Sequence, residues 1–303
     1  MVKSKMKDSK SYTIFRIINT ALLVVLSFVF FYPYWNMIVK AFNAPADTIR
    51  GDLTFLPRVW TLDNIGVVLA DTRTLTGFIV STLRVISGSA LALLVTYFAA
   101  YALLKKYLRG RNAILIYLTI PMFFGGGLIP TYKLYSDIGI YNSFFVYILP
   151  VAFNFFNMVV IRAYLQTVPE SLSESARIDG ASEIKILFSI MFPLSMPVIA
   201  TILLWNAVFH WNDWTTTLYF VDNRNLFTLQ YNLYQAIAEL DEIKANIDRL
   251  KQSGGVTGDD YDVLYQEAIQ SAQFVISTLP ILCVYPFLQR YFVHGVMVGS
   301  IKE

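Results

Sequence analysis

A group of acidic and basic side chains lies in one short polar stretch between two long apolar segments. Residues 174–185 place the carboxylates of Glu174, Asp179 and Glu183 close to the cations Arg177 and Lys185. Carboxylates of this kind form strong charge-assisted hydrogen bonds with a cationic partner. No convergent polar triad accompanies them, so the stretch favours recognition of a partner over catalysis.

A second set of polar side chains lies inside or at the ends of apolar segments. His210 and the four residues after it form the sequence H-W-N-D-W at the outer end of one such segment. Aromatic and polar anchors are typical of a membrane interface. Flat rings also stack on sugar faces, and amides or carboxylates bond hydroxyl groups, so a contact with a passing sugar is the sharper alternative. The candidate residues of a substrate pathway are Asn154, Asn157, Asn206, His210, Trp211, Asn212 and Asp213.

Several kinds of chemistry have no sequence pattern here. No G-x-x-x-x-G-K-[ST] motif could cradle a nucleotide, and no H-E-x-x-H motif could hold zinc. The two histidines, His210 and His294, are far apart, and Cys283 is the single cysteine, which we expect to be a small buried hydrophobe. We therefore expect no cofactor and no metal on this chain.

The composition is that of a membrane protein. Of 303 residues, 56% are hydrophobic and only 15% are charged, whereas soluble domains carry about 25% charged residues. The apolar residues gather in blocks of about twenty or more, the length that crosses a bilayer. The net charge of +3 is small and scattered, which argues against a nucleic-acid partner.

These blocks predict an all-α polytopic membrane protein with six transmembrane helices. A tail of residues 1–14 precedes a single transmembrane domain of residues 15–303. Prolines and the run Gly125–Gly127 predict a broken third span, and Pro193 and Pro197 predict a kinked fifth span. The expected spans are residues 15–39, 85–104, 113–135, 144–165, 186–210 and 272–292.

The charges between the spans predict the orientation. Lysines crowd the first ten residues, and Lys105, Lys106, Arg109 and Arg111 follow the second span, so both segments are expected in the cytoplasm. Both termini are then cytoplasmic. Residues 211–271, with ten acidic and four basic side chains, form an extracytoplasmic loop. The inner loop of residues 166–185 is acidic, which calls for a separate explanation.

The outer loop has a pattern of its own. Apolar residues from Leu226 to Leu250 alternate spacings of three and four, which predicts a helix over residues 226–250. A second helix is expected to rise from Tyr261 into the sixth span. The first helix either packs on a partner protein or forms a hairpin with residues 261–271.

The six expected spans contain no aspartate or glutamate. A proton-driven carrier needs a buried ionisable relay, whereas a sodium-coupled carrier could use backbone carbonyls. The energy source is therefore expected in a partner protein.

Residues 174–193 resemble the EAA loop of binding-protein-dependent ABC importer permeases, E-A-A, three residues, G, nine residues, I-x-L-P. Glu174, Ala176, Gly180, Ile190 and Pro193 match at the required spacing, while Ser175 and Phe192 depart from the pattern. The sequences D-G-A-S and F-P-L-S-M-P nearby are similar to the carbohydrate, maltose-transporter-like branch.

The resemblance implies a type I importer for a sugar or oligosaccharide. Its partners would be a second permease subunit, expected to be a paralogue, two ATPase subunits that carry ATP and magnesium, and an extracytoplasmic solute-binding protein. A coupling helix over residues 169–181 would fit a groove on an ATPase. The resemblance gives the coupling role to Leu172, Glu174, Ser175, Ala176, Arg177, Ile178, Asp179 and Gly180.

It also suggests that the tail, residues 294–303, reaches the ATPase, against the alternative of a disordered end. The other functions considered are a permease for a non-sugar solute, a stand-alone secondary transporter and a membrane-embedded enzyme.

Overall fold

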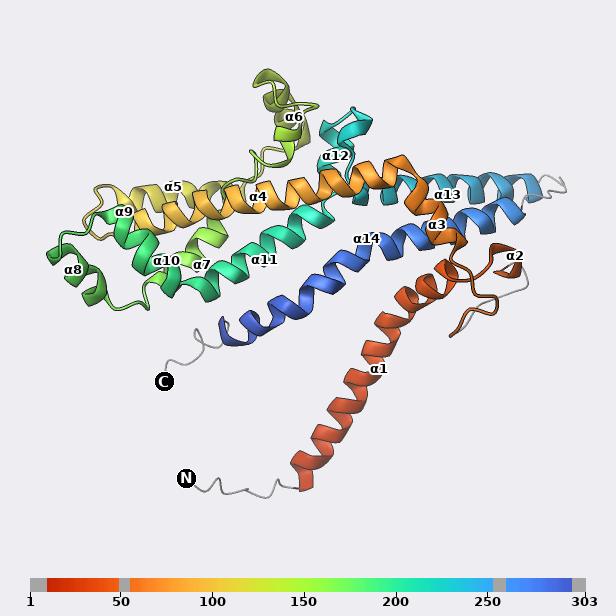
Figure 1. Ribbon diagram of the computed structural model, residues 1–303, viewed down its shortest axis with the longest axis horizontal. Coiled ribbons are helices and arrows are strands. Elements are labelled where there is room, and N and C mark those ends of the chain that lie inside the picture. Colours follow the sequence, from red (N-terminus) through yellow and green to blue (C-terminus); the bar gives the residue numbers. More distant parts are fainter. Residues whose placement is uncertain (1–9, 49–54, 253–259, 296–303) are drawn as a thin grey trace. The chain divides into compact units, whose positions relative to one another are not determined.

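The computed structural model describes residues 10–48, 55–252 and 260–295, and these residues are almost entirely helical (Figure 1). Within these ranges no strand forms, and a single isolated bridge joins Asn43 to Trp60. The all-α fold class predicted from the sequence is confirmed. Most of the tail of residues 1–14 and most of the C-terminal segment 294–303 lie outside the described ranges.

The chain divides into two compact units. One contains residues up to 69 together with 236–276, and the other contains residues 70–235 together with those from 277 onward. Helices α13 (Leu229–Gln252) and α14 (Asp260–Gly295) contribute residues to both. They correspond to the helices predicted over residues 226–250 and from Tyr261 into the sixth span, so both predictions are confirmed as helices.

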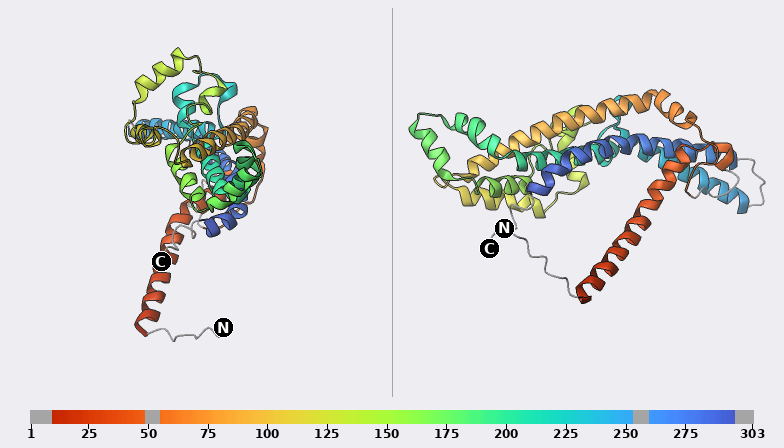
Figure 2. Two further views of the ribbon diagram at one scale, coloured as in Figure 1. Left: turned by 90° about the vertical axis from the view of Figure 1, so that its left-hand side faces the viewer. Right: turned by 60° about the horizontal axis from the view of Figure 1, so that its bottom comes forward.

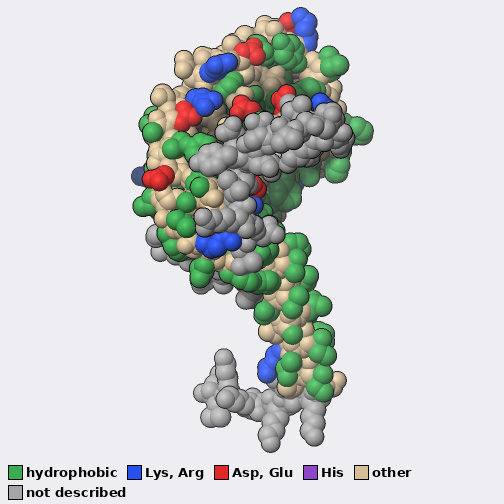
Figure 3. Space-filling view, turned by 90° about the vertical axis from the view of Figure 1, so that its right-hand side faces the viewer, with side chains coloured by type: hydrophobic (Ala, Val, Ile, Leu, Met, Phe, Trp, Pro, Cys, Tyr) green, Lys and Arg blue, Asp and Glu red, His purple; other side chains and the backbone are tan. Residues whose placement is uncertain are grey.

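The first unit is dominated by α1 (Lys10–Ala41), followed by α2 (Pro45–Thr48) and α3 (Asp63–Ala70). No part of the most apolar window of α1 is buried within the chain, and Figure 3 shows hydrophobic side chains along it. Such a surface is stable only in lipid or against another protein. At the other end of α1, Lys40 Nζ pairs with Glu267 at 2.9 Å and Asn64 donates to the carbonyl of Ala41 at 3.0 Å.

The second unit is built around α4 (Thr72–Leu104), which packs beside α7 (Phe155–Leu165) and α11 (Met196–Asn212) (Figures 1 and 2). Asp71 caps α4, because its side chain accepts from the backbone N–H of Arg73 at 2.9 Å. The helix is longer than the span expected at residues 85–104. Its core with α7 and α11 is apolar and includes Leu93, Tyr97, Ala100, Met158, Ile161, Ile199 and Ile202.

The two breaks predicted from glycine and proline are present. Helix α5 (Arg111–Phe123) stops before Gly125, and α6 (Leu128–Asp137) leaves it at an angle of 116°. Similarly, α9 (Glu183–Ile186) runs through a π-helical turn (Leu187–Met191) and α10 (Phe192–Leu194), and α11 then bends away by 81°. Ser195 at this bend bonds the carbonyl of Met191 and the hydroxyl of Tyr97, which fixes the kink against α4.

The predicted helical span over residues 144–165 is not a single helix. Residues Phe144–Tyr147 form a 3₁₀ turn, and α7 starts only at Phe155. Pro150 cannot supply a helical N–H, and the Asn154 side chain caps α7 by accepting from the backbone N–H of Asn157 at 3.0 Å. The prediction of one continuous helix over this segment is therefore wrong.

Three helices in the described ranges are long and apolar enough to cross a bilayer, Ser11–Ala41, Thr72–Leu104 and Tyr265–Val284. The two bent pairs raise the number to five if each counts as one span. Helix α7 is only 11 residues long, about 17 Å, which is short of the roughly 30 Å hydrocarbon thickness. One further prediction is wrong: Cys283 on α14 is exposed rather than buried.

Candidate functional site

The predicted coupling segment contains the short helix α8 (Glu170–Ile178). Pro169 stands at its N-cap and Glu170 in its first turn, where a negative charge meets the positive end of the helix dipole. Gly180, with φ of +78°, ends the helix in the left-handed region that favours glycine. Ser182 then caps α9 by accepting from the backbone N–H of Lys185 at 3.3 Å.

One face of α8 is fixed to the body of the chain. Ser173 is buried and its hydroxyl lies 3.7 Å from the sulfur of Met191 in the π-helical turn. Ala176 packs against the same apolar core, and its carbonyl accepts from the N–H of Ala181 at 2.9 Å. The sequence had assigned Ala176 to contact with a partner, whereas here it contacts the chain itself.

The opposite face of α8 is open. Ile178 is 86% exposed and Leu172 is 43% exposed, although both are apolar. Glu174 and Ser175 are exposed between them, and Asp179 and Gly180 are exposed at the end of the helix. An exposed face with two large apolar residues flanking a carboxylate can bind a groove that offers apolar contacts and a cation.

Glu183 connects α8 to the C-terminal end of α4. Its carboxylate accepts from Arg177 Nε at 2.8 Å and from the Tyr101 hydroxyl at 2.7 Å, and it lies 3.0 Å from Lys105 Nζ. Burial alone raises the pKa of Glu183, but the hydrogen bonds from these three groups outweigh it and hold the pKa at about 2. Arg177, predicted to meet the partner, is therefore engaged within the chain. We refer to the group of Tyr101, Lys105, Arg177 and Glu183 as the Glu183 junction.

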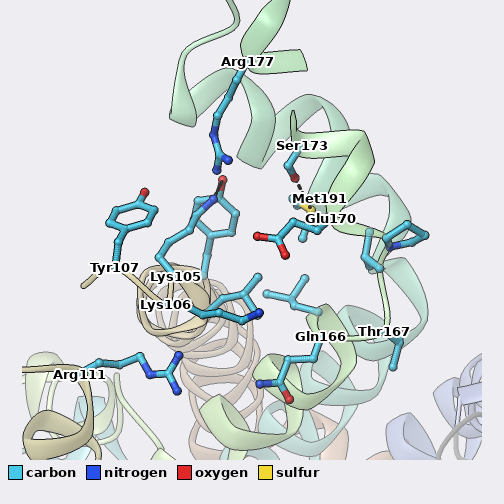
Figure 4. Close-up of a pocket in the computed structure, with 15 residues that line it drawn as sticks. Lys105, Lys106, Tyr107, Arg111, Gln166, Thr167, Glu170, Ser173, Arg177 and Met191 are labelled. Atoms are coloured by element: carbon cyan, nitrogen blue, oxygen red, sulfur yellow. Dashed lines mark hydrogen bonds between the residues drawn. The ribbon is translucent and has the colours of Figure 1, made fainter. Parts of the chain in front are cut away.

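A cavity of about 640 Å³ lies between α8 and the neighbouring ends of α4, α5 and α7 (Figure 4). Figure 4 shows Lys105, Lys106, Arg111 and Gln166 on one side and Glu170, Ser173 and Arg177 from α8 on the other. Its wall is rich in cations, with Lys105, Lys106, Arg111 and Arg177 against Glu170 as the one acid. The sequence analysis used Lys105, Lys106 and Arg111 only as a sign of membrane orientation, and it gave Arg177 a coupling role.

Of the four asparagines proposed for the substrate pathway, two form a pair and the other two lie apart from it. Asn157 on α7 donates to Asn206 on α11 at 3.3 Å, and both side chains are buried. Among the described residues, the amide nitrogen of Asn206 has no hydrogen-bond partner. Asn154 is exposed and caps α7.

The four residues from His210 to Asp213 point in different directions. His210 is buried against Gly88 of α4, and the Trp211 indole donates to the carbonyl of Ser277 at 2.9 Å. Asn212 is exposed and bonds the carbonyl of Val208 within its own helix. Of the four, Asn212 alone offers an exposed side chain.

Asp213 forms an ion pair that the sequence did not predict. Arg84 is only 1% exposed, its guanidinium pairs with the Asp213 carboxylate, and it donates to the Asp213 carbonyl at 2.8 Å. Burial raises the pKa of Asp213, but Arg84, Thr215 and Thr216 outweigh it and hold the pKa at about 2. The guanidinium also lies over the ring of Tyr147, 4.6 Å from its centroid. The sequence clue was an arginine within an apolar helix, which requires a partner away from lipid.

Among the residues with described positions, no three His, Cys, Asp or Glu side chains gather as metal ligands. The candidate site consists of the partly exposed helix α8 and the Glu183 junction next to it. Two buried polar contacts, Asn157–Asn206 and Arg84–Asp213, lie elsewhere among α4, α7 and α11.

Known proteins share this sequence and fold. Protein LplC of Bacillus subtilis (strain 168) is 34% identical over 297 residues, which cover 98% of each chain. The polygalacturonan/rhamnogalacturonan transport system permease protein YtcP of the same organism is 28% identical, over 92% of this chain and 95% of its own. The crystal structure of a bacterial ABC transporter involved in the import of the acidic polysaccharide alginate contains a chain that superposes with a TM-score of 0.84. That chain is 27% identical, and the superposition covers 95% of this chain and all of that one.

Residues 65–298 match the family described as the binding-protein-dependent transport system inner membrane component. This family is a component of a transport system rather than an enzyme, and the matched range includes residues 174–193. With more than two thirds of its length matched, the chain belongs to the family of binding-protein-dependent transport system inner membrane components.

Proposed function

We propose that this chain is a permease subunit of an ATP-driven importer for a sugar or oligosaccharide. Support comes from the family and from relatives whose names refer to polygalacturonan, rhamnogalacturonan and alginate. The chain itself hydrolyses nothing, and ATP and magnesium belong to a separate ATPase subunit. The permease lies in the cytoplasmic membrane as a multi-pass protein.

The proposed topology has six spans with both termini in the cytoplasm. Helices α1, α4 and α14 supply three spans, and the two bent pairs α5–α6 and α9–α11 supply two more. The apolar segment of residues 144–165, with α7 at its inner end, supplies the sixth. This arrangement places α8 on the cytoplasmic side and residues 211–271 outside.

The observation that carries the proposal is that one face of α8 packs on the chain and the opposite face is exposed. Its inner face is fastened to the π-helical turn by Ser173 and Ala176, while Leu172, Glu174 and Ile178 face outward. Helix α8 can therefore be pushed by a partner and transmit the displacement to α9–α11. The Glu183 junction transmits the same displacement to α4.

Four partners follow from this function. A solute-binding protein docks on the extracytoplasmic side, a second permease, which we take to be a paralogue, completes the pathway, and two ATPase subunits grip the coupling helices. A ligand can shift a two-state transporter only through different contacts in the two states. The closed ATPase dimer and the docked binding protein supply those different contacts.

The pathway itself is proposed to pass the polar residues of α7 and α11. Asn154 and Asn212 offer exposed side chains to a sugar, whereas the buried Asn157–Asn206 pair would have to open toward the pathway. His210, Trp211 and Asp213 support the pathway wall from within.

Charge reversal at Glu174 tests the coupling role. Glu174 is exposed on the outward face, so Glu174→Lys should leave insertion and folding intact. Loss of a charge-assisted contact at an interface should lower ATP-driven sugar uptake at least about tenfold, while ATP hydrolysis persists. Uptake and hydrolysis would be measured with the assembled importer in proteoliposomes.

Glu242→Lys is the matched control, because Glu242 is an exposed acid on α13 rather than α8. It should keep coupled uptake. Normal uptake by the Glu174 variant would show that α8 is not the coupling element.

A further inference from the structure

The cavity beside α8 contains positive charge that the chain does not neutralise. Lys105 and Arg177 are compensated by Glu183, at 3.0 and 2.8 Å respectively. Lys106 and Arg111 also line the cavity, and within the described part of the chain neither forms an ion pair. Arg111 in addition repels Arg162 nearby. Cations crowded around one cavity favour an anionic occupant.

The position of the cavity indicates where such an anion would come from. Lys105 caps the end of α4, Arg111 begins α5, and Leu165 ends α7, so three expected spans end at its wall. On the proposed topology this level is the inner surface of the bilayer. Tyr107, 72% exposed, also lines the cavity, and tyrosine is enriched at the level of the lipid head groups.

We propose that this cavity binds the phosphodiester head group of an anionic lipid from the inner leaflet. Basic pockets between transmembrane helices on the cytoplasmic side bind such head groups. The volume of about 640 Å³ falls within the usual range for small-ligand sites. Lys106 and Arg111 hold the phosphate oxygens, and Gln166 adds an amide donor from the end of α7 (Figure 4). This inference rests on the proposed function, since it needs the cytoplasmic placement of α8.

Occupancy of the site acts on the coupling helix. Glu170 and Arg177 of α8 form the opposite wall (Figure 4), so a bound phosphate repels the first and attracts the second. Lipid composition therefore changes the preferred position of α8. A zwitterionic lipid, with no net charge, exerts a weaker effect.

Lipid retention by the purified importer tests the site directly. Native mass spectrometry would count phosphatidylglycerol and phosphatidylcholine bound to the wild-type complex and to the variant with Lys106→Gln and Arg111→Gln. We expect phosphatidylglycerol retention to weaken about fivefold for each cation removed. Arg109→Gln is the matched control, because Arg109 is an exposed cation of the same loop that does not line the cavity.

Unchanged retention in the double variant overturns the proposal, as does equal loss in the Arg109 control. Calorimetry would also measure the binding of inorganic phosphate. If the wild type retains no lipid but binds phosphate, and the double variant does not bind it, the site belongs to a free phosphate and the proposed lipid ligand is wrong. A crosslink between the Lys106→Cys variant and the ATPase in lipid-saturated complexes would show that the cavity is a protein interface, and this result overturns the lipid proposal.

Uptake in vesicles separates this inference from the proposed function. Sugar uptake by the wild type and by the Arg109 control should change as phosphatidylglycerol replaces phosphatidylcholine, whereas the double variant should respond less. Absence of ATP-driven uptake in every lipid refutes the proposed function, while the retention measurement still decides whether the site binds lipid.

Discussion

Helix α4 is tied at two places to the same stretch of chain, residues 183–213, in contrasting ways. At one end Lys105 and Tyr101 meet Glu183, whose side chain is 44% exposed. In the N-terminal half of the helix, Arg84 meets Asp213, and the two side chains are 1% and 9% exposed. An exposed ion pair contributes little and exchanges partners easily, whereas a buried pair is costly to break. This difference fits the proposed coupling role of α8, because the contact beside α8 can yield while the buried contact with Asp213 stays rigid.

Breaking the buried pair should have the largest effect. Arg84→Ala leaves the Asp213 carboxylate buried without its cation, which should lower the free energy of unfolding by about 3–5 kcal/mol. Thermal unfolding of the purified complex in detergent measures the loss. Replacing both residues, with Arg84→Met and Asp213→Leu, should cost less than Arg84→Ala alone, because no charge is left buried. A double variant as unstable as the single one would contradict the rigid contact.

Packing beside that pair should give an intermediate effect. A Cβ on Gly88 would overlap the imidazole of His210, so Gly88→Ala should destabilise the chain by about 1–3 kcal/mol. Combining it with His210→Ala should recover part of the loss. Gly66→Ala is the control, because a Cβ there meets nothing within 4 Å and removes only unfolded-state freedom. Equal unfolding temperatures for the two alanine variants would show that α4 and α11 can separate without cost.

Local features of the sequence predicted the segment around α8 well. Pro169, Gly180 and Ser182 act through their own backbone and immediate neighbours, so the bounds of α8 and the start of α9 follow from residue type. The break at Gly125–Gly127 was predictable for the same reason. Span 144–165 was read as a helix because hydropathy records an apolar environment and not helix continuity.

The contacts that join distant segments were not predictable from the sequence. Arg84 and Asp213 are 129 residues apart along the chain, and only the packing of α4 on α11 makes them neighbours. Glu183 likewise appeared as one acid in an acidic loop, since Tyr101 and Lys105, at the end of another helix, lie 82 and 78 residues away. The role of Arg177 could not be inferred either. Whether its guanidinium bonds a residue of this chain or of a partner depends on the position of Glu183.

The smallest effect on stability is expected at the Glu183 junction. Glu183→Gln should cost less than about 1 kcal/mol, because solvent screens this exposed group. The pKa of Glu183 is lowered to about 2 in the folded chain from an ordinary 4.5, so its ionised form stabilises the fold above pH 4.5. That contribution should fall away as the pH drops from 4.5 through about 2, and the variant should lack this part of the pH dependence. Unfolding temperatures at pH 6, 4 and 3 measure the difference between the two proteins. If the variant instead loses as much stability as Arg84→Ala, the contact at Glu183 is as rigid as the contact at Asp213, and α8 cannot move independently of α4.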